Sequence, residues 1–439
     1  MCDSGRGTAV SALGKIVRSI GRDWRNLGAE ERYAFPDDWS IQEYFVRDME
    51  ELTDADVARR IDAPLAYCGV STCLEDLARG KGRVIILFDD LSRWTPAYTL
   101  APPLVATLQR AGIERSRIHF MAALGSHRAM SREEMALKLG RDIVGRYAVS
   151  NHDCYRDDAV ELGTGRYGTP IRINREVVEA DLVIALGMIT NHGFAYASGG
   201  AKIILPGVAH VDTIRRNHRS ESGGRFEASE LKGDEEERKY GPIRAEMNQA
   251  AEMLLGRTEV VAINVALNRE RGIAGVFVGD PLSMFREHAE ALMRQYQIPF
   301  DRTKRVDIGV FRVDSLDPLQ YYKGMLHWEE VCDFRIVVGD FSDRFVYQGQ
   351  RHGRFEHYMR RLEERGSMPN APLRESLRTD GTIFLCSPHL DSTSIKMFNP
   401  KFHIVTDWVS FMTELHQELG SRRRVAFFQD SFLQILDMV

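Results

Sequence analysis

Short apolar runs alternate along the chain with longer segments whose apolar residues recur at helical spacing. The apolar runs are rich in β-branched residues and predict buried strands at 84–88, 118–124, 181–187, 260–266 and 274–278. Between them, residues 101–111 read as a helix, and Ser131-x-x-Glu134 is a capping box that opens another. This strand–helix–strand order predicts an α/β fold with a mostly parallel sheet.

A second series of the same kind begins near residue 271. Its predicted strands are 306–313, 335–338, 383–386 and 425–428, and its predicted helices are 282–295 and 408–419. We therefore expect two α/β domains with mostly parallel sheets and an active-site cleft between them. The expected divisions are an N-terminal extension (1–40), a cofactor-binding domain (41–270), a second domain giving substrate contacts (271–415), and a C-terminal segment returning to the first domain (416–439). The polar segment 223–241 is expected to be a long loop.

Composition narrows the class of protein. The 439 residues carry a net charge of -5, which argues against a nucleic-acid partner. No apolar stretch is long enough to span a membrane. The basic, amphipathic segment 11–24 reads as a surface helix or dimer arm rather than a transit peptide. The six cysteines are scattered without CxxC pairs, so we expect reduced thiols and a cytoplasmic location, with Cys154 as a buried side chain. A homodimer is a separate expectation.

The segment 163–168 matches GxGxxG, the dinucleotide-binding pattern. That pattern needs a preceding strand and a following helix, whose N-terminus receives the pyrophosphate. Here a turn and a strand are predicted to follow, so a dinucleotide site is not expected.

Several chemically active side chains come directly after predicted strands. Asp90 and Arg93 follow the first strand, His127 the second, and His192 the strand at 181–187. Ligands of open α/β sheets bind at this edge, which makes these residues candidates for a site. Arg93, held by Asp90, could bind a carboxylate, and the histidines could exchange protons. The alternatives are an Asp–Arg pair that caps a helix and histidines that are ordinary loop residues.

The segment 191–202 combines His192, Ser198, the pair Gly199–Gly200, and Lys202. Glycines allow close backbone approach to a ligand, and a lysine among apolar residues can become a nucleophile or an attachment point. The alternative is a tight turn with a surface lysine. His218 ends a predicted helix. Farther along, Gln320 and Lys323 would share one helix face, where they could hold the oxygens of a hydroxy acid.

In this order, from about residue 83 to the end, the clusters resemble the nickel-dependent lactate racemase family. The resemblance rests on Asp-x-x-Arg, Gly-x-His-Arg, a strand followed by His and then Lys after a glycine pair, a further His, and Gln-x-x-Lys. It implies a 2-hydroxy-acid racemase or epimerase, an isomerase that inverts C2 by abstraction and return of a hydride. The implied cofactor is a nickel-pincer nucleotide, pyridinium-3,5-bisthiocarboxylic acid mononucleotide nickel, joined covalently to Lys202 by cofactor-maturation enzymes.

The resemblance also implies roles for the individual residues. His218 would be the nickel ligand, and His127 and His192 the two acid/base residues. Asp90, Ser198, Gly199 and Gly200 would support the cofactor site, and Arg93, Gln320 and Lys323 would bind the substrate.

The sequence departs from the family pattern at Ser92, Ala201 and Asn217, where Thr, Arg and Met are usual; these differences favour a 2-hydroxy acid other than lactate, such as a larger one. Two other interpretations stay open. The same His and Asp residues could bind a metal directly in a hydrolase or lyase, or the chain could bind an organic acid without turning it over.

Overall fold

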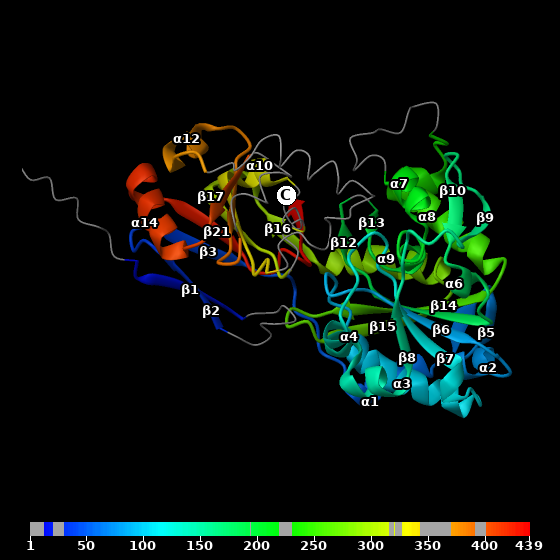
Figure 1. The fold of residues 1–439 in the computed structure, drawn as a ribbon. Coiled ribbons are helices and arrows are strands. Elements are labelled where there is room, and N and C mark those ends of the chain that lie inside the picture. The colour runs from blue at the N-terminus through cyan, green and yellow to red at the C-terminus, as the bar shows by residue number, and fades with distance from the viewer. Residues whose placement is uncertain are drawn as a thin grey trace, which may run out of the picture. The chain divides into compact units, whose positions relative to one another are not determined.

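The structure is a computed structural model, and it describes residues 13–20, 30–193, 195–218, 231–315, 320, 327–342, 370–390 and 401–439. The chain divides into two compact units (Figure 1). Unit 1 comprises Met1–Phe45, Ile298–Phe345 and His357–Val439, and unit 2 comprises Val46–Gln297 and Val346–Glu356. Each unit is built around its own six-stranded sheet.

The sheet of unit 2 has the order β15-β14-β11-β6-β7-β8. All neighbouring strands are parallel except β15, which runs antiparallel to β14. The bounds are β6 Val84–Phe88, β7 Ile118–Ala122, β8 Ala148–Asn151, β11 Leu182–Met188, β14 Glu259–Leu267 and β15 Ile273–Gly279. The five apolar runs expected in this part of the chain are therefore all strands. Every residue of β6 and of β11 is buried, as expected for parallel strands covered on both faces.

The helices of unit 2 pack around this sheet. The capping box of α4 is confirmed, since the Ser131 side chain accepts from the backbone of Glu134 and the Glu134 side chain accepts from the backbone of Ser131. The expected helix near 101–111 begins four residues earlier, and Pro102 and Pro103 lie inside it. The bounds are α1 Asp54–Ile61, α2 Leu74–Ala78, α3 Ala97–Arg110, η1 Arg115–Arg117, α4 Arg132–Leu139, α5 Arg141–Arg146, α6 Arg175–Val178, η2 Gly200–Ile203, α7 Val211–Asn217, α8 Glu235–Leu255 and α9 Ser283–Gln295.

Unit 2 also contains short antiparallel pairs: β4 Leu65–Tyr67 with β5 Val70–Thr72, β9 Val160–Thr164 with β10 Pro170–Ile173, and β12 Asn191–His192 with β13 Tyr196–Ala197. The GxGxxG segment forms the turn between β9 and β10. Gly165 N–H donates to the Thr169 carbonyl at 2.7 Å and closes this turn. The turn and strand expected after the motif are therefore found, and no helix begins there.

Unit 1 contains a fully parallel sheet of order β20-β19-β18-β17-β21-β3. Its strands are β3 Ser40–Tyr44, β17 Val306–Arg312, β18 Cys332–Val338, β19 Ile383–Cys386, β20 Phe402–Val405 and β21 Arg424–Phe428. The remaining described elements are β1 Lys15–Ile20, β2 Glu30–Phe35, β16 Gln297–Phe300, η3 Arg302–Lys304, α10 Trp328–Val331, α12 Leu373–Arg378, α14 Trp408–Leu419 and β22 Ile435–Met438. Two α/β units with mostly parallel sheets were expected, and both are found.

The divisions of the chain differ from those expected. Residues 273–297 stay with unit 2, because β15 pairs with β14 and completes that sheet. The segment 416–439 belongs to unit 1 rather than returning to the first domain, since β21 lies between β17 and β3. Residues 15–20 form a strand paired with β2, not a helix, and the N-terminal region supplies β3 to the sheet. Of the expected loop 223–241, residues 235–241 are helical, with a kink at Gly241, and residues 219–230 lie outside the described ranges.

Candidate functional site

The strand order of unit 2 creates a switch point between β6 and β11. The chain leaves β6 toward β7 and β8 on one side, then returns to β11 and β14 on the other. Ligands of open α/β sheets bind at the carboxyl ends of the strands that flank such a point (Figure 1). Asp90 follows β6, His127 follows β7, and His192 follows β11, so the sheet brings the three loops to one edge.

Asp90 and His127 form the most direct contact between candidate residues. His127 Nδ1 lies 2.5 Å from Asp90 Oδ2, and the Asp90 side chain is 4% exposed. Burial by itself would raise the pKa of Asp90. The charge and hydrogen bond of His127, helped by Arg93 and Ser92, outweigh this and hold that pKa well below its usual range. The carboxylate is therefore ionised and fixes the orientation of the imidazole.

The same carboxylate shapes the backbone turn that carries Arg93. Asp90 Oδ1 accepts from the Ser92 N–H at 2.9 Å and from its hydroxyl at 2.5 Å. Arg93 Nη1 donates to the carbonyl and hydroxyl oxygens of Ser92, at 3.1 and 3.0 Å. Ser92, rather than Asp90, therefore holds the Arg93 guanidinium, which differs from the expectation. Ser92 and Asp90 are buried, whereas Arg93 is partly exposed and can meet a ligand.

The loop of His127 is bonded to the turn that carries Lys202. Gly125 N–H donates to the Gly207 carbonyl at 2.8 Å, and Gly207 N–H donates to the Lys202 carbonyl at 3.4 Å. Lys202 lies on η2 and is partly exposed, although its neighbours Ala201 and Ile204 are buried. These bonds place the backbone of Lys202 beside the loop of His127.

The glycine pair before Lys202 fits tightly against the protein itself. Gly199 has φ +84°, and a Cβ there would lie 2.5 Å from Asn264 Oδ1 and 2.9 Å from Ile189 Cγ1. Gly200 has φ +55°, and a Cβ there would lie 2.8 Å from the Pro281 carbonyl oxygen. Gly200 N–H also donates to Asn264 Oδ1 at 2.7 Å. Packing within unit 2 thus accounts for both glycines without a ligand, which differs from the expectation of close ligand approach.

A buried arginine holds the segment between His192 and Lys202. Arg244 on α8 donates through Nε to the Ala195 carbonyl at 3.1 Å, through Nη1 to the Gly199 carbonyl at 3.1 Å, and through Nη2 to the Ala197 carbonyl. Its guanidinium lies 4.2 Å from the centre of the Phe285 ring. Burial lowers the pKa of Arg244 to about 9, so it keeps its charge at neutral pH. One side chain therefore fixes the backbone on both sides of Ser198.

The other predicted residues of this segment are buried. The Ser198 hydroxyl donates to the Met188 carbonyl at 2.8 Å and accepts from Thr190 N–H at 3.0 Å, so it closes the loop after β11. His192 is 7% exposed and stands opposite Tyr196 in the β12–β13 pair.

His218 directly follows α7 and is 5% exposed. The preceding Asn217 is fully buried and donates from Nδ2 to Glu246 Oε2 at 3.0 Å and to the Ile243 carbonyl at 3.2 Å, both on α8. Asn217 therefore faces the core, and its difference from the family pattern concerns packing. Residues of η2, α7 and α8 belong to the same hydrophobic cluster.

The two candidates from the later part of the chain fall in unit 1. Gln320 is 1% exposed. Lys323 lies outside the described residues, so their common helix face stays a prediction.

Lys138 and Arg244 were not expected to contribute. Their sequence signal is a charged residue on the apolar face of a helix. Lys138 shares the buried face of α4 with Met135 and Leu139, and Arg244 shares that of α8 with Met247. Charged side chains are seldom fully buried without a specific role.

Cys154 is buried, as expected, and burial raises the pKa of its thiol to about 12. No group of three or more His, Cys, Asp and Glu side chains able to hold a metal ion occurs in the described ranges.

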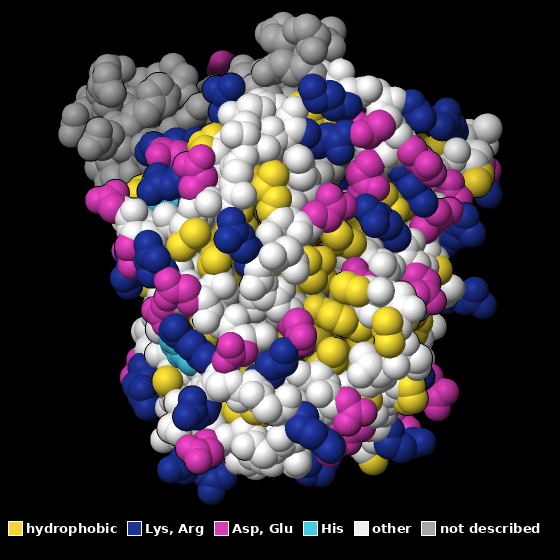
Figure 2. All heavy atoms as spheres, turned by 90° about the vertical axis from the view of Figure 1, so that its right-hand side faces the viewer, with side chains coloured by type: hydrophobic (Ala, Val, Ile, Leu, Met, Phe, Trp, Pro, Cys, Tyr) yellow, Lys and Arg dark blue, Asp and Glu magenta, His cyan; other side chains and the backbone are white. Residues whose placement is uncertain are grey.

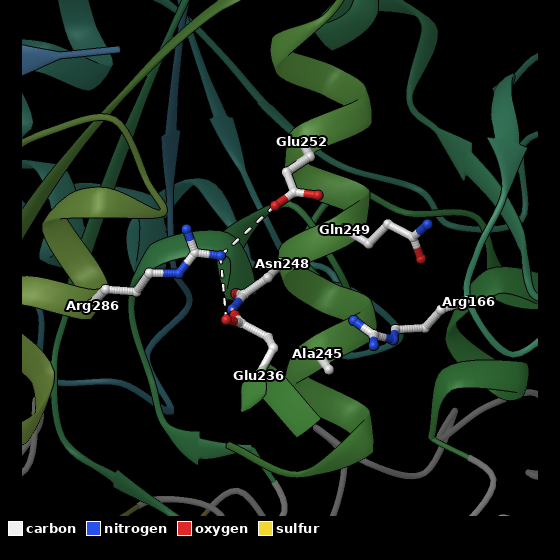
Figure 3. Close-up of a pocket in the computed structure, with 7 residues that line it drawn as sticks. All are labelled: Arg166, Glu236, Ala245, Asn248, Gln249, Glu252 and Arg286. Carbon is white, nitrogen blue, oxygen red and sulfur yellow. Dashed lines mark hydrogen bonds and ion pairs between the residues drawn. The ribbon is translucent and has the colours of Figure 1, made fainter. Parts of the chain in front are cut away.

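A polar pocket of about 200 Å³ lies on the outer side of α8 (Figure 3). Its lining residues are Arg166, Glu236, Ala245, Asn248, Gln249, Glu252 and Arg286. Figure 3 shows Arg286 pointing to Glu236 and Glu252, at 3.3 and 3.8 Å. The pocket contains none of the predicted site residues, and its charges largely neutralise one another.

The described part of the chain has no helix that is both long and apolar enough to cross a membrane. On the face drawn in Figure 2, the described Lys and Arg side chains are interspersed with Asp and Glu and form no extended basic patch.

Comparisons with known proteins point to one family. Residues 29–227 match the family described as Lactate racemase N-terminal domain. The chain is 35% identical over 227 residues to a lactate racemase of Lactiplantibacillus plantarum, covering 51% of this chain and 50% of that protein. It is 38% identical over 149 residues to a lactate racemase of Thermoanaerobacterium thermosaccharolyticum, covering 34% and 35%. In these alignments the chain thus spans half or less of the length of its curated relatives.

Solved structures extend the similarity in fold. The lactate racemase apoprotein of T. thermosaccharolyticum matches with a TM-score of 0.68 and 21% identity, over 96% of this chain and 100% of that one. A Thermotoga maritima protein matches with a TM-score of 0.62 and 15% identity, over 89% and 100%.

Proposed function

We propose that the protein is a 2-hydroxy-acid racemase or epimerase, because residues 29–227 match the family described as Lactate racemase N-terminal domain. The proposal rests mainly on the contact between His127 and the ionised, buried Asp90. The loop that carries His127 is also hydrogen-bonded to the segment that carries Lys202. One edge of one sheet would then carry a proton-transfer group (His127), a carboxylate-binding arginine (Arg93) and an attachment point for a cofactor (Lys202). We propose a larger 2-hydroxy acid than lactate as the substrate.

The residues present suit a lysine-tethered nickel-pincer nucleotide. Lys202 would carry it, because the residue is partly exposed on a turn whose backbone is fixed by the contacts of Gly199, Gly200 and Arg244. His218 would supply a nickel ligand, since imidazole is a suitable donor for nickel and this one is held at the end of a packed helix. When bound there, the cofactor would supply a reversible hydride acceptor for the C2 hydrogen of the substrate.

His127 would move the hydroxyl proton of the substrate. Its Nδ1–H donates to the ionised Asp90, so the proton-accepting nitrogen of the neutral ring is Nε2. Nε2 takes the hydroxyl proton as C2 loses its hydrogen and gives it back in the reverse direction. Mirror-image substrates need an equivalent group on the other side, and His192 would have this role.

Arg93 would bind the substrate carboxylate. Its guanidinium is planar and always charged, which suits a carboxylate, and the bonds to Ser92 limit its motion. With the substrate carboxylate fixed, the substrate C2 would lie between the two proton-transfer groups. Gln320 and Lys323 are proposed to add contacts to the substrate oxygens.

The test is a stereochemical screen of full-length protein produced together with cofactor-maturation enzymes. Single enantiomers of small and larger 2-hydroxy acids are incubated with it, and chiral chromatography follows the appearance of the opposite configuration. Intact-mass and peptide mapping locate any adduct on Lys202. We expect inversion of at least one 2-hydroxy acid by protein with the adduct. An adduct on Lys202 without inversion of any substrate would refute the racemase activity, and inversion without an adduct would refute the tether.

A further inference from the structure

Lys138 on α4 is a fully buried lysine, with a side chain 0% exposed. Its ammonium points to the loop between β6 and α3. It lies 2.7 Å from Asp89 Oδ1 as an ion pair and donates to the Asp90 carbonyl at 3.1 Å and the Arg93 carbonyl at 2.8 Å. Only a protonated lysine has donors for three such acceptors.

These acceptors are spread over the loop that carries the candidate residues. Asp90 binds His127 with its carboxylate and Lys138 with its carbonyl. Arg93 binds Ser92 with its guanidinium and Lys138 with its carbonyl. One ammonium therefore fixes the backbone at both ends of the turn from Asp90 to Arg93.

Neutralising Asp89 does not by itself account for this arrangement. Burial raises the pKa of Asp89 and lowers that of Lys138, although the charge of each residue favours the charged form of the other. An apolar pair at these positions would avoid the cost of burying two charges. Thr95 already donates to Asp89 Oδ2 at 2.5 Å. The two carbonyl bonds of Lys138 are the part of the arrangement that acts on the site.

We propose that Lys138 is a positioning residue, which sets Arg93 for the substrate carboxylate and Asp90 for His127 through their backbone carbonyls. Its effect on substrate rests on the proposed function, whereas its effect on the His127 ring does not.

The experiment compares three variants with the wild type. Lys138→Met removes the ammonium but leaves Asp89 charged and buried, which destabilises the fold. Asp89→Asn/Lys138→Met removes both charges and keeps the volume, so it separates neutralisation from positioning. Met135→Ala is the matched control, because Met135 is also buried on α4 and its loss destabilises the helix without removing a donor to the loop.

The first readout needs neither cofactor nor substrate. Nitrogen NMR of histidine-labelled protein, with the His127 signals assigned by His127→Gln, reports which ring nitrogen carries the proton. We expect mainly the Nδ1–H form in the wild type and in Met135→Ala, and a mixture of both forms in the double variant. The wild-type form in a folded double variant would overturn the proposal.

The second readout is steady-state kinetics of cofactor-loaded protein with an equal Lys202 adduct by mass. We expect the double variant to lose about 100-fold in kcat/KM, mainly through a higher KM, because a small misplacement of a substrate-binding group has a cost of this order. Met135→Ala should lose less than about threefold. Wild-type kcat/KM in the double variant would also overturn the proposal. If the wild type inverts no 2-hydroxy acid, the proposed function fails, and the NMR comparison alone decides the role of Lys138.

Discussion

Replacing Gly199 by alanine tests whether the glycine pair before Lys202 serves packing. The matched control is Gly241→Ala, also in unit 2. Gly241 has φ +80° and ψ 163°, and Gly199 has φ +84° and ψ −178°, but a Cβ at Gly241 would meet nothing within 4 Å. Both variants bear the cost of a side chain in a backbone region that almost only glycine adopts, about 1–3 kcal/mol. Only Gly199→Ala adds an overlap with Asn264 Oδ1 and Ile189 Cγ1.

The additional cost at position 199 follows from what must move. Relieving the overlap by overpacking costs about 1–3 kcal/mol. Displacing Asn264 also weakens its 2.7 Å bond to Gly200 N–H, a buried donor whose loss costs about 1–3 kcal/mol. Since the two responses are alternatives in part, we expect Gly199→Ala to be about 2–4 kcal/mol less stable than Gly241→Ala.

The assay is thermal unfolding of both variants without cofactor, followed by calorimetry. For a domain of this size, 1 kcal/mol shifts Tm by roughly 2–4 °C, so Gly199→Ala should melt roughly 4–16 °C below the control. Equal melting temperatures would refute the packing explanation. The positive φ at Gly199 would then have to serve a ligand, and Gly199→Ala should instead lower cofactor attachment to Lys202.

The other predictions concern the proton-transfer groups and the response to acid. His127→Ala and His192→Ala should each lower interconversion of enantiomers by about 10²-fold or more while the Lys202 adduct still forms; chiral chromatography and intact mass check this, and wild-type activity in either variant would remove that residue from the mechanism. Asp90→Asn should lower kcat by roughly 10²- to 10⁴-fold because an amide no longer selects the Nδ1–H form of His127, and unchanged kcat would show that the contact is incidental. Burial lowers the pKa of His152 to about 4. The unfolded chain binds this proton below about pH 6.5 and the folded chain only near pH 4, so stability should fall as the pH falls through that window, by up to about 3 kcal/mol. Urea unfolding from pH 7 to 4 should show a shallower decline for His152→Gln, and parallel curves would contradict this assignment.

Most strands of the two sheets were predictable because their signal is local, whereas the less apolar edge strands β3, β8 and β20 were not predicted. Runs such as Val84–Phe88 and Ile383–Cys386 are apolar throughout and became strands with the same bounds. The partners of the strands were not predictable in the same way. The pairing of β3 with β21 joins residues almost 400 positions apart, and nothing in either segment identifies the other. The misplacement of 416–439 comes from this distant pairing, whereas that of 273–297 comes from the local pairing of β15 with β14.

The candidate side chains were found because they follow strands directly, where topology limits their position. The contacts that hold these side chains in place were not predicted. Arg93 was expected to lie against Asp90 because an Asp-x-x-Arg turn favours that contact, but the carboxylate is occupied by Ser92 and His127. Ser92, His127 and Arg93 compete for the two carboxylate oxygens of Asp90. The outcome depends on His127, which lies 37 residues away, so the turn alone does not predict it.

Lys138 and Arg244 show what remains hidden in a single sequence. Each lies on an apolar helix face, where a charge is costly unless its donors are used. Lys138 has a carboxylate partner, whereas Arg244 has none within 4 Å among the described residues and relies on carbonyl oxygens and the Phe285 ring. Both bind backbone carbonyls of a loop that carries candidate residues, one after β6 and the other after β11. Carbonyl groups are the same in every residue, so the sequence of a loop does not reveal that a distant cation holds it. The sequence signal lies in the helix instead, as a Lys or Arg at a position whose helical spacing places it on the buried face. Such a residue is a candidate for holding a functional loop.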